Sequence, residues 1–431
     1  MNNKILLTNN DLFKEYEINL PGSKSFTNRA LILAALKNYK ISFSNFSDSN
    51  DSLVVISALE KLGKSIKFIN NTLKIEGTLK AYKGTIDIKE AGTSSRFLTS
   101  LISFIPGSKV LLTGEGRILE RPIDDLVDTL RKLGADIKYI EKKGSLPLMI
   151  KGVDKPKQDF CEIDISKSSQ FFSSIALVLP SLMDNFKLII NSELTSNSYI
   201  EMTNDVIKKF GFKIIKKDGY NYEYIKLDKK IKNFTVEGDA SGASYFLSHA
   251  FLSESTCRIN NLNLNSTQGD IQYIKILESL GAKIKNSDLN NYTELTGIKS
   301  FKGIPEINME LMPDTAQSLA VVLSLADTES NISGLKTLKI KETDRIEAIK
   351  KELSKIGITS QTTNKSIKII PSKINNNFNC DTYSDHRMAM SMAIYSAKFN
   401  NIQINNPIVV GKSYPSFWTH LEKTGVKCKY L

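Results

Sequence analysis

Residues that form disulfides or hold metal ions are scarce in this sequence. It contains four cysteines (Cys161, Cys257, Cys380 and Cys428) and only three histidines among 431 residues. The cysteines are far apart and form no Cys-x-x-Cys pair, so their spacing fits no zinc site. We therefore expect four reduced thiols and predict no metal.

Long apolar runs are also absent. No run reaches the roughly 18 residues that a membrane-spanning helix needs, and residues 1–8 lack the long apolar core of a signal peptide. The composition, 41% hydrophobic and 24% charged, is that of an ordinary globular protein, and the length suits two or three domains. We expect a cytosolic protein without a membrane partner.

The charge is unbalanced toward the positive side. The 58 Lys and Arg residues outnumber the 46 Asp and Glu residues, which gives a formal net charge of +12. Lysine as the common surface residue is one explanation, and attraction of anionic ligands is the other. The chain has no basic tail, no basic patch interleaved with aromatics and no zinc-finger spacing, so nucleic-acid binding is not predicted.

One pattern is repeated six times: an amphipathic, helix-like stretch ends in a glycine and is followed by an alternating, strand-like run. Before Gly357, for example, Ile346, Ile349, Leu353 and Ile356 follow one another at spacings that share a helix face. Glycine suits the position after a helix because the backbone there often needs a positive φ. The glycines recur about every 72 residues and are Gly63, Gly134, Gly211, Gly281, Gly357 and Gly425.

A second series of helix-like stretches is in register with the first. These stretches open with small polar residues at 22–25, 92–95, 168–170, 239–242, 314–316 and 384–386. Residues 29–36, 175–179, 319–325 and 388–394 are apolar on nearly every side. Such stretches predict buried helices.

The repeat predicts the architecture. One buried helix, one amphipathic helix and short strands, such as those expected at 135–140 and 282–285, form an α/β unit. Three units in each half give two similar domains of the α/β class. The second domain is expected to begin near Val236, after the polar stretch 228–233.

The starts of the buried helices are the predicted functional positions. Their first turns have unpaired N–H groups and the positive end of the helix dipole, and small residues there allow an anion to approach closely. Several such starts converging on one cleft would form an anion-binding site between the domains.

Two charged turns fit anion binding, each with a plain alternative. Gly22–Ser25 followed by Arg29 supplies a glycine turn, hydroxyls, the ammonium of Lys24 and a guanidinium. It is not a Walker A loop, and a solvated helix start explains it equally well. Gly114–Pro122 brings two arginines, including Arg121, into a turn, where a surface ion-pair cluster is the alternative.

The run 341–345 places five polar residues before a helix. We expect Thr343 to cap this helix, with Glu342 and Asp344 favoured by its dipole. Lys341 and Arg345 oppose the dipole, which points to an anionic partner.

Charge also leads directly into two buried helices. In 383–390 a Ser-Asp-His-Arg run precedes apolar residues, and burying charge without partners costs several kcal/mol. We favour the lining of a binding site there over a network within the core. Asp314 opens another buried helix, as a cap or as a general base, and both roles stay open at this point.

Taken in order, these clusters resemble the EPSP synthase (3-phosphoshikimate 1-carboxyvinyltransferase) family of enolpyruvyl transferases. The matching motifs extend from about residue 20 to the last helix: LPGSKSxxxRA, AGTxxR, GExRxxERP, SSQF, EGDAS, PDxA, KETDR and DHRMAM. The resemblance implies an inside-out α/β barrel fold, with buried central helices and outer mixed sheets in both domains. It also implies that residues 20–235 form one domain, that residues 1–19 and 236–431 form the other, and that the active site lies in the cleft between them.

The resemblance further implies an activity. The enolpyruvyl group of phosphoenolpyruvate would pass to the 5-hydroxyl of shikimate 3-phosphate through a tetrahedral intermediate, with release of phosphate, in the shikimate pathway to chorismate and the aromatic amino acids. No metal or organic cofactor is implied. We expect a cytoplasmic monomer that acts on these small molecules and is inhibited by glyphosate, a competitor of phosphoenolpyruvate.

Matching the motifs residue by residue implies the roles within the site. Shikimate 3-phosphate would be held by Ser25, Arg29, Ser168, Ser169, Gln170, Ser196, Tyr199, Asp314 and Lys341. Phosphoenolpyruvate would be held by Lys24, Gly92, Arg121, Gln170, Arg345, Arg387 and Lys412. Asp314 would accept the proton of the 5-hydroxyl, and Glu342, together with Lys24, would move the proton of the methylene carbon.

Three positions depart from the family pattern. Glu90 and Thr337 stand where asparagine is usual, and Phe97 stands where proline or leucine is frequent. We expect Glu90 to turn away from a bound phosphate or to pair with Arg96. A UDP-N-acetylglucosamine enolpyruvyl transferase is an alternative, but its usual catalytic cysteine loop is not matched. Two further alternatives are an RNA 3′-phosphate cyclase-like enzyme, which needs a histidine nucleophile, and a non-catalytic binding module.

Overall fold

The computed structural model of the chain describes residues 3–69, 72–194, 196–217, 219–287, 292–376 and 378–431. Its internal contacts divide the chain into two compact units. The N-terminal unit is Gly22–Val236, and the C-terminal unit is Met1–Pro21 together with Glu237–Leu431.

Helices of two kinds alternate in the N-terminal unit. α1 (Lys24–Ala35), α3 (Gly92–Ser103) and α5 (Gln170–Leu182) have almost every residue buried. α2 (Asn50–Lys61), α4 (Asp124–Lys132) and α6 (Asn197–Lys209) bury only one side. A short 3-10 helix, η1 (Gly116–Leu119), precedes α4.

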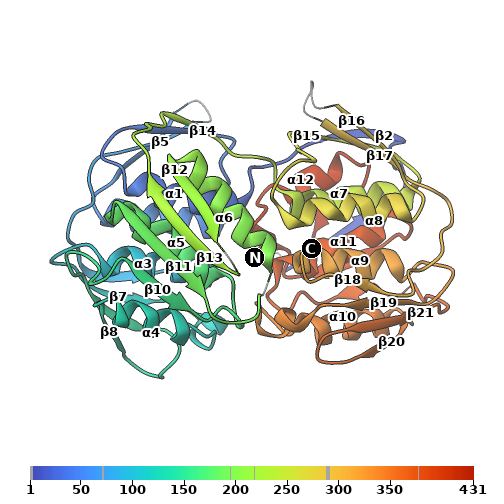
Figure 1. Cartoon of the computed structure of the whole chain (residues 1–431). Helices are drawn as coiled ribbons and strands as arrows, with labels where there is room; N and C mark the ends of the chain where they lie inside the picture. The colour runs from blue at the N-terminus through green and yellow to red at the C-terminus, as the bar shows by residue number, and fades with distance from the viewer. Residues whose placement is uncertain (1–2, 70–71, 195, 218, 288–291, 377) are drawn as a thin grey trace. The chain divides into compact units, whose positions relative to one another are not determined.

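Short strands cover these helices. The strands of the N-terminal unit are β3 (Ile41–Ser44), β4 (Ser65–Ile69), β5 (Thr72–Glu76), β6 (Lys83–Asp87), β7 (Lys109–Thr113), β8 (Asp136–Tyr139), β9 (Leu148–Lys151), β10 (Phe160–Ile163), β11 (Asn185–Ile190), β12 (Phe212–Lys217), β13 (Asn221–Lys226) and β14 (Asn233–Thr235). They form three four-stranded sheets in the orders β14-β3-β5-β4, β6-β7-β9-β8 and β10-β11-β13-β12. In each unit the buried helices lie inside, and the sheets lie outside them (Figure 1).

All three sheets share one topology. In the second sheet, β6 and β7 are parallel, and β7–β9 and β9–β8 are antiparallel. The parallel strands flank α3 in the chain, as expected because parallel neighbours need a crossover connection. The other two sheets repeat this pattern, with one parallel and two antiparallel pairs each.

The C-terminal unit repeats the arrangement. Its buried helices are α7 (Ala240–Ser253), α9 (Ala316–Leu323) and α11 (His386–Ala393), and its amphipathic helices are α8 (Tyr273–Ser279), α10 (Arg345–Lys355) and α12 (Phe417–Glu422). Its 3-10 helices are η2 (Gly269–Gln272), η3 (Pro313–Thr315), η4 (Lys336–Ile340), η5 (Ile394–Ala397) and η6 (Pro407–Lys412).

Its three sheets have the orders β16-β17-β15-β2, β18-β19-β21-β20 and β22-β23-β1-β24. Their strands are β1 (Lys4–Thr8), β2 (Glu15–Asn19), β15 (Thr256–Asn260), β16 (Lys283–Ser287), β17 (Tyr292–Thr296), β18 (Ile307–Asn308), β19 (Ser330–Ser333), β20 (Thr359–Thr362), β21 (Ile367–Ile370), β22 (Asn379–Cys380), β23 (Ile402–Asn405) and β24 (Lys427–Tyr430).

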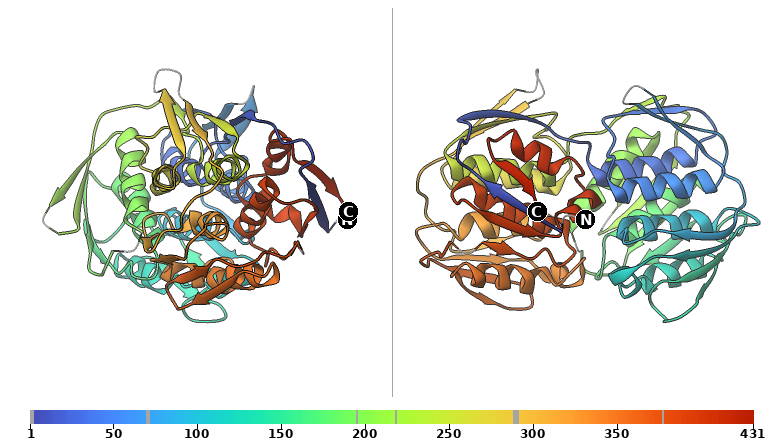
Figure 2. Two further views of the ribbon diagram at one scale, coloured as in Figure 1. Left: turned by 90° about the vertical axis from the view of Figure 1, so that its right-hand side faces the viewer. Right: turned by 180° about the vertical axis from the view of Figure 1, so that it is seen from behind.

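The first two strands of the chain, β1 and β2, pair with strands from the C-terminal half of the sequence. β1 lies between β23 and β24, and β2 pairs in parallel with β15, so the N-terminal strands complete sheets of the C-terminal unit. Figure 2 shows the blue first strand beside the red last strand. Within the N-terminal unit, the last strand, β14, pairs in parallel with the first, β3.

The predicted helix stops are confirmed. Each of the six glycines follows one of the amphipathic helices and has a positive φ, between 88° and 109°. The buried helices are also confirmed, and they approach one another closely through small side chains. Ser100 and Ser174 are 2.6 Å apart, and Ser318 lies 3.2 Å from Ser244 and 3.4 Å from Ser391. Among the described residues, no helix is long and apolar enough to cross a membrane.

Candidate active site

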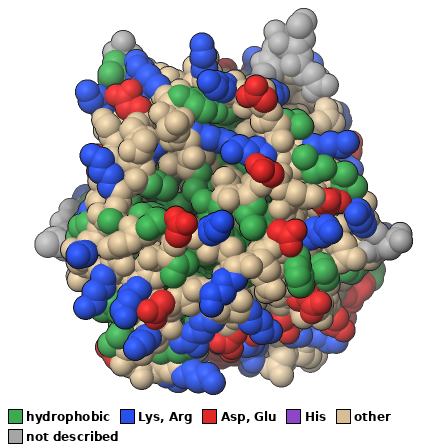
Figure 3. All heavy atoms as spheres, turned by 60° about the vertical axis from the view of Figure 1, so that its left-hand side comes forward, with side chains coloured by type: hydrophobic (Ala, Val, Ile, Leu, Met, Phe, Trp, Pro, Cys, Tyr) green, Lys and Arg blue, Asp and Glu red, His purple; other side chains and the backbone are tan. Residues whose placement is uncertain are grey.

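Buried cations, rather than surface lysines, mark the candidate site. On the face drawn in Figure 3, Lys and Arg side chains are scattered and acidic side chains stand between them. Arg29 and Arg345, by contrast, are among the largest fully buried side chains of the protein. A buried guanidinium is costly unless it has partners, so each of these residues requires an explanation.

Among the residues that the structure describes in the N-terminal unit, Arg29 has only neutral neighbours. Its Nε donates to Thr203 Oγ1 at 2.8 Å, its Nη1 to the Ser25 carbonyl at 3.0 Å, and its Nη2 to Ser173 Oγ at 3.1 Å. The guanidinium also lies over the rings of Phe97 and Tyr199. Burial lowers the pKa of Arg29 to about 10. Because a guanidinium has five N–H groups, two remain for an anion.

Lys24 begins α1 beside an acidic residue that the motifs did not assign. Its Nζ lies 2.9 Å from Asp51 Oδ2, and the two side chains are 13% and 6% exposed. Asp51 stands in the first turn of α2, where the helix dipole favours a carboxylate. Ser94 of α3 donates to the Asp51 carbonyl at 3.1 Å, which ties the start of α2 to α3.

The start of α3 lies against Arg121. A Cβ atom added to Gly92 would overlap the Arg121 guanidinium, with Cζ at 2.9 Å, so only glycine leaves this space open. Arg96 connects the same two segments: it donates to the Gly92 carbonyl at 3.0 Å and to the Pro122 carbonyl at 2.6 Å. Arg96 therefore holds the turn that carries Arg121 against the helix start.

The remaining predicted residues of this unit lie at the starts of α5 and α6. Gln170 Nε2 donates to Thr93 Oγ1 at 3.2 Å, and its buried Oε1 has no hydrogen-bond partner among the described residues. Ser196, before α6, has a φ of 53°, a left-handed conformation that costs a non-glycine residue free energy and is concentrated at functional sites. Ser168 and Ser169 precede Gln170, and Ser169 is the residue that precedes the first turn of α5.

In the C-terminal unit, the cations surround Asp314. Arg345 Nη1 donates to its Oδ1 at 2.9 Å, and Arg387 Nη2 donates to its Oδ2 at 3.0 Å. Lys341 Nζ lies 3.6 Å from Oδ1. Neither η3 nor α9 has a side-chain cap hydrogen bond, but Asp314 lies in the first turn of η3, where the helix dipole favours a carboxylate.

Arg345 is the centre of this network. Besides Asp314, it contacts Glu342 at 2.9 Å and Asp385 at 2.7 Å. Burial lowers the pKa of Arg345, but the charges of Asp385, Glu342 and Asp314 outweigh burial and raise it above its usual value. Lys412 Nζ, 3.5 Å from Glu342 Oε1, adds a fourth cation.

Two predictions about local structure need correction. Asp344, not Thr343, caps α10, because its Oδ1 accepts from the backbone of Glu347. Asp385 and His386 are fully buried, and Asp385 both caps α11 and pairs with Arg345, so these two residues belong to a core network. We had favoured a binding-site lining for the whole run.

The departures from the family pattern have structural partners. Phe97 is completely buried under Arg29, so its ring packs against the guanidinium. Glu90 Oε1 faces the Gly116 turn, 2.8 Å from where a Cβ of Gly116 would be. Thr337 is half-buried in η4.

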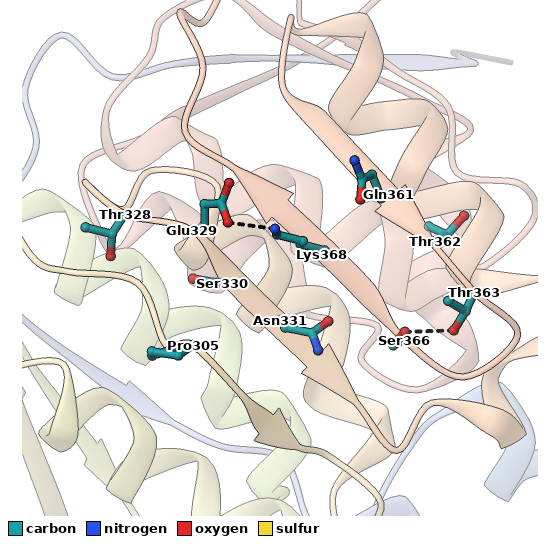
Figure 4. Close-up of a pocket in the computed structure, with 10 residues that line it drawn as sticks. All are labelled: Pro305, Thr328, Glu329, Ser330, Asn331, Gln361, Thr362, Thr363, Ser366 and Lys368. Atoms are coloured by element: carbon teal, nitrogen blue, oxygen red, sulfur yellow. Dashed lines mark hydrogen bonds and ion pairs between the residues drawn. The ribbon is translucent and has the colours of Figure 1, made fainter.

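A hollow on the outer sheet of the C-terminal unit is separate from these residues. It has a volume of about 810 Å³ and is lined mainly by polar side chains of β19, β20, β21 and adjoining loops (Figure 4). Glu329 and Lys368 form a 2.7 Å ion pair there. None of its lining residues is a predicted site residue, so this hollow is not the candidate site.

Comparison with known proteins decides the family. The sequence profile described as EPSP synthase (3-phosphoshikimate 1-carboxyvinyltransferase) matches residues 14–421. The 3-phosphoshikimate 1-carboxyvinyltransferase of Buchnera aphidicola subsp. Cinara cedri is 36% identical over 419 residues, which cover 93% of both chains. That of Psychromonas ingrahamii is 35% identical and covers 94% of this chain and 96% of its own. This chain belongs to the EPSP synthase family.

The fold of the EPSP synthase family is found throughout the chain. An EPSP synthase structure from Acinetobacter baumannii aligns with a TM-score of 0.81 at 22% identity and covers 99% of each chain, and a second structure from that organism gives 0.80. The predicted family, the α/β fold and the prediction of an enzyme are therefore confirmed.

Sequence reasoning missed residues that hold the EPSP synthase motif residues in place. Asp51 carries no local signal, because it is remote in sequence from Lys24. Arg96 and Asp385 stand inside quoted motifs, AGTxxR and DHRMAM, but Arg96 was considered only as a partner of Glu90, and Asp385 only as part of a charged run. The available signal was a charged residue within a motif, four residues after Gly92 for Arg96 and two residues before Arg387 for Asp385.

Proposed function

We propose that this chain transfers the enolpyruvyl group of phosphoenolpyruvate to the 5-hydroxyl of shikimate 3-phosphate and releases inorganic phosphate. The observation that carries this proposal is the family match, which includes both groups of cations at the helix starts. Both substrates are phosphorylated carboxylates, so a site for them needs several cations. As the resemblance implies, the reaction needs no metal or organic cofactor.

We propose that Arg29 and its neighbours hold shikimate 3-phosphate. The buried guanidinium has no acidic partner among the described residues, and a phosphate would supply the missing charge. Ser25, Ser168, Ser169, Gln170, Ser196, Tyr199, Asp314 and Lys341 complete the proposed set. Hydroxyl and amide groups suit the sugar-like hydroxyls of the substrate, and the buried Oε1 of Gln170 is an acceptor for one of them.

We propose that phosphoenolpyruvate is held by Lys24, Arg121, Arg345, Arg387 and Lys412, with Gly92 lining the pocket and Gln170 touching both substrates. In the free protein, Arg345 and Arg387 contact Asp314. When the carboxylate of the substrate takes their donors, Asp314 loses cations that favour its charged form. Asp314 thereby becomes a stronger base once the site is loaded.

Proton transfer then accompanies each bond change. In the addition step, the hydroxyl oxygen bonds to C2 of phosphoenolpyruvate, Asp314 takes the hydroxyl proton, and Glu342, with Lys24, protonates C3. In the elimination step, a proton returns from C3 to Glu342 or Lys24, the C2–O bond to phosphate breaks as the C2–C3 double bond reforms, and the leaving phosphate takes the proton held by Asp314. A positioned acid or base of this kind contributes about 10²–10⁴-fold.

The location and the assembly state are also proposals. We propose a cytosolic monomer that does not bind nucleic acid. The four cysteines are free thiols, which suits a reducing compartment, and the Lys and Arg side chains in Figure 3 form no continuous basic stripe. Light scattering after size-exclusion chromatography, and a gel-shift assay at physiological salt, test the monomer and the absence of nucleic-acid binding.

Phosphate release with different acceptors tests the function. With phosphoenolpyruvate present, we expect release with shikimate 3-phosphate and none with UDP-N-acetylglucosamine or without acceptor. The product should contain the enolpyruvyl ether at the 5-position by NMR. Turnover with UDP-N-acetylglucosamine alone would show that the alternative transferase activity is correct.

A further inference from the structure

A buried acid next to the candidate site is not used by the mechanism above. Asp270 lies in η2, whose preceding residue Gln268 fixes it against the start of α7. Gln268 Oε1 accepts from the Ala240 backbone at 3.1 Å, and its Nε2 donates to the Gly238 carbonyl at 2.9 Å. Gln268 and Asp270 are 4% and 8% exposed. The position of Asp270 is therefore fixed by α7, not by a mobile surface turn.

One hydroxyl connects Asp270 to the candidate site. Ser241 Oγ, in the first turn of α7, donates a short hydrogen bond to Asp270 Oδ2. Ser241 Oγ also accepts a hydrogen bond from Arg387 Nη2 at 3.4 Å. The Nη2 atom donates in addition to Asp314 Oδ2 at 3.0 Å. The Nη1 atom of Arg387 donates to the Asp314 carbonyl at 3.2 Å. Asp270 and Asp314 therefore bracket a single guanidinium.

Charge around Asp270 is unbalanced. Burial and the negative charge of Asp314 raise the pKa of Asp270 to about 7, against the lowering effects of Arg387 and Ser241. Asp239, the cap of α7, also raises it. α7, η3 and α11 thus present Asp239, Asp314 and Arg387 to this carboxyl. At neutral pH both its protonated and its ionised forms are populated.

We propose that Asp270 and Ser241 form a positioning pair for Arg387 and that the ionisation of Asp270 sets the affinity for phosphoenolpyruvate. The pair directs the guanidinium, while Asp270 itself touches no substrate. An ionised Asp270 adds a second negative charge beside the cation that the substrate anion needs, whereas a protonated Asp270 does not. This inference rests on the proposed function and identifies a regulated element of the same site.

The sign of the pH effect follows from this arrangement. Below about pH 7 Asp270 is protonated, and the anionic substrate binds more tightly. Above this pH the ionised carboxylate opposes the substrate, so KM for phosphoenolpyruvate rises. Asparagine mimics the neutral, protonated form of Asp270. The substitution therefore removes the part of the pH dependence of KM that comes from Asp270. The ionisation of the substrate itself affects every variant alike and cancels in their ratio.

The test compares KM values of Asp270→Asn and native enzyme at pH 6 and pH 8. We expect the KM for phosphoenolpyruvate of the two to agree within about twofold at pH 6 and to be about fivefold lower in Asp270→Asn at pH 8, as expected for removing one nearby charge. KM for shikimate 3-phosphate should not change. Asp327→Asn, an exposed acid beyond the far end of α9 from Asp314, is the matched control and should follow the native enzyme at both pH values.

Ser241→Ala is the second variant, and it removes the connecting hydroxyl while leaving Asp270 in place. We expect its KM for phosphoenolpyruvate to rise about fivefold at pH 7, the loss of one modest hydrogen bond, with an unchanged melting temperature. If Asp270→Asn does not fold, the KM of Ser241→Ala alone tests the proposal. Identical pH dependence in Asp270→Asn and native enzyme, or an unchanged KM in Ser241→Ala, overturns the proposal. The proposed function survives both results provided that native enzyme converts shikimate 3-phosphate, and it fails independently if native enzyme does not.

Discussion

Replacement of Lys24 by methionine separates catalysis from stability in the candidate site. Methionine keeps the apolar stem of the side chain and removes only the ammonium. The structure predicts two consequences of different size, because Lys24 pairs with Asp51 and is also proposed to bind phosphoenolpyruvate.

The cost in stability comes from Asp51. Loss of one partner of a fully buried ion pair costs about 3–5 kcal/mol, and an exposed pair is worth about 0–1 kcal/mol. This pair lies between these limits, because 13% of the Lys24 side chain is exposed and the dipole of α2 supports Asp51. We estimate a loss of about 1–2 kcal/mol, or roughly 2–8 °C in melting temperature.

The loss of activity is expected to be larger. Lys24 is proposed to bind the substrate anion and to assist proton transfer, so we expect kcat to fall about 10³-fold, equivalent to about 4 kcal/mol in the barrier. The double variant Lys24→Met/Asp51→Asn removes the unpaired carboxylate and should recover the melting temperature without recovering kcat. Phosphate release and thermal unfolding of both variants make the measurement. If folded Lys24→Met retains kcat within tenfold of native enzyme, or if the double variant regains activity, Lys24 acts only as the partner of Asp51.

Three further substitutions test neighbouring parts of the reasoning. Gly92→Ala should raise KM for phosphoenolpyruvate and reduce inhibition by glyphosate, because the new methyl group displaces the Arg121 guanidinium; equal inhibition curves would show that Gly92 is remote from the pocket. Arg345→Met should destabilise the protein by about 3–5 kcal/mol, since it leaves Asp385 buried without its cation, and a native melting temperature would contradict the network. Asp270→Asn should raise the melting temperature at pH 8 and leave it unchanged at pH 4, because a carboxyl with a raised pKa stabilises the fold less as pH rises toward 7; a pH-independent difference would argue against a buried, titrating Asp270.

The repeat made most of the fold predictable. A glycine with positive φ and a one-sided apolar face are local requirements, so the six helix ends could be read from sequence. The buried helices were equally visible, because a helix covered on all sides needs apolar residues on all sides. The partners of β2 and β14 were not visible, since pairing between strands far apart in the sequence leaves no periodic signal. The family resemblance alone implied that residues 1–19, which contain β1 and β2, belong with the second domain.

The charged residues of the candidate site could be singled out from the sequence, but their pairing could not. Charges at helix starts stand out against an apolar background, which is why Lys341, Arg345 and Arg387 were predicted as site residues. Their partners come from other segments, and neither the spacing nor the residue types indicate that Asp314 lies between two arginines. The predicted cap of α10 was wrong by one position. Threonine and aspartate are both good caps, and the sequence does not show which of two adjacent candidates caps the helix.

The two buried arginines indicate different electrostatic designs in the two units. Among the described residues Arg29 has only neutral partners, and burial lowers its pKa to about 10, which suits its proposed role in holding the phosphate of shikimate 3-phosphate. Arg345 is held by three carboxylates, which raise its pKa. In the proposed reaction, an arriving anion would displace one of these acids to reach Arg345. The paired cation therefore suits the proposed acid–base step, and the cation with neutral partners suits the proposed retention of a phosphate.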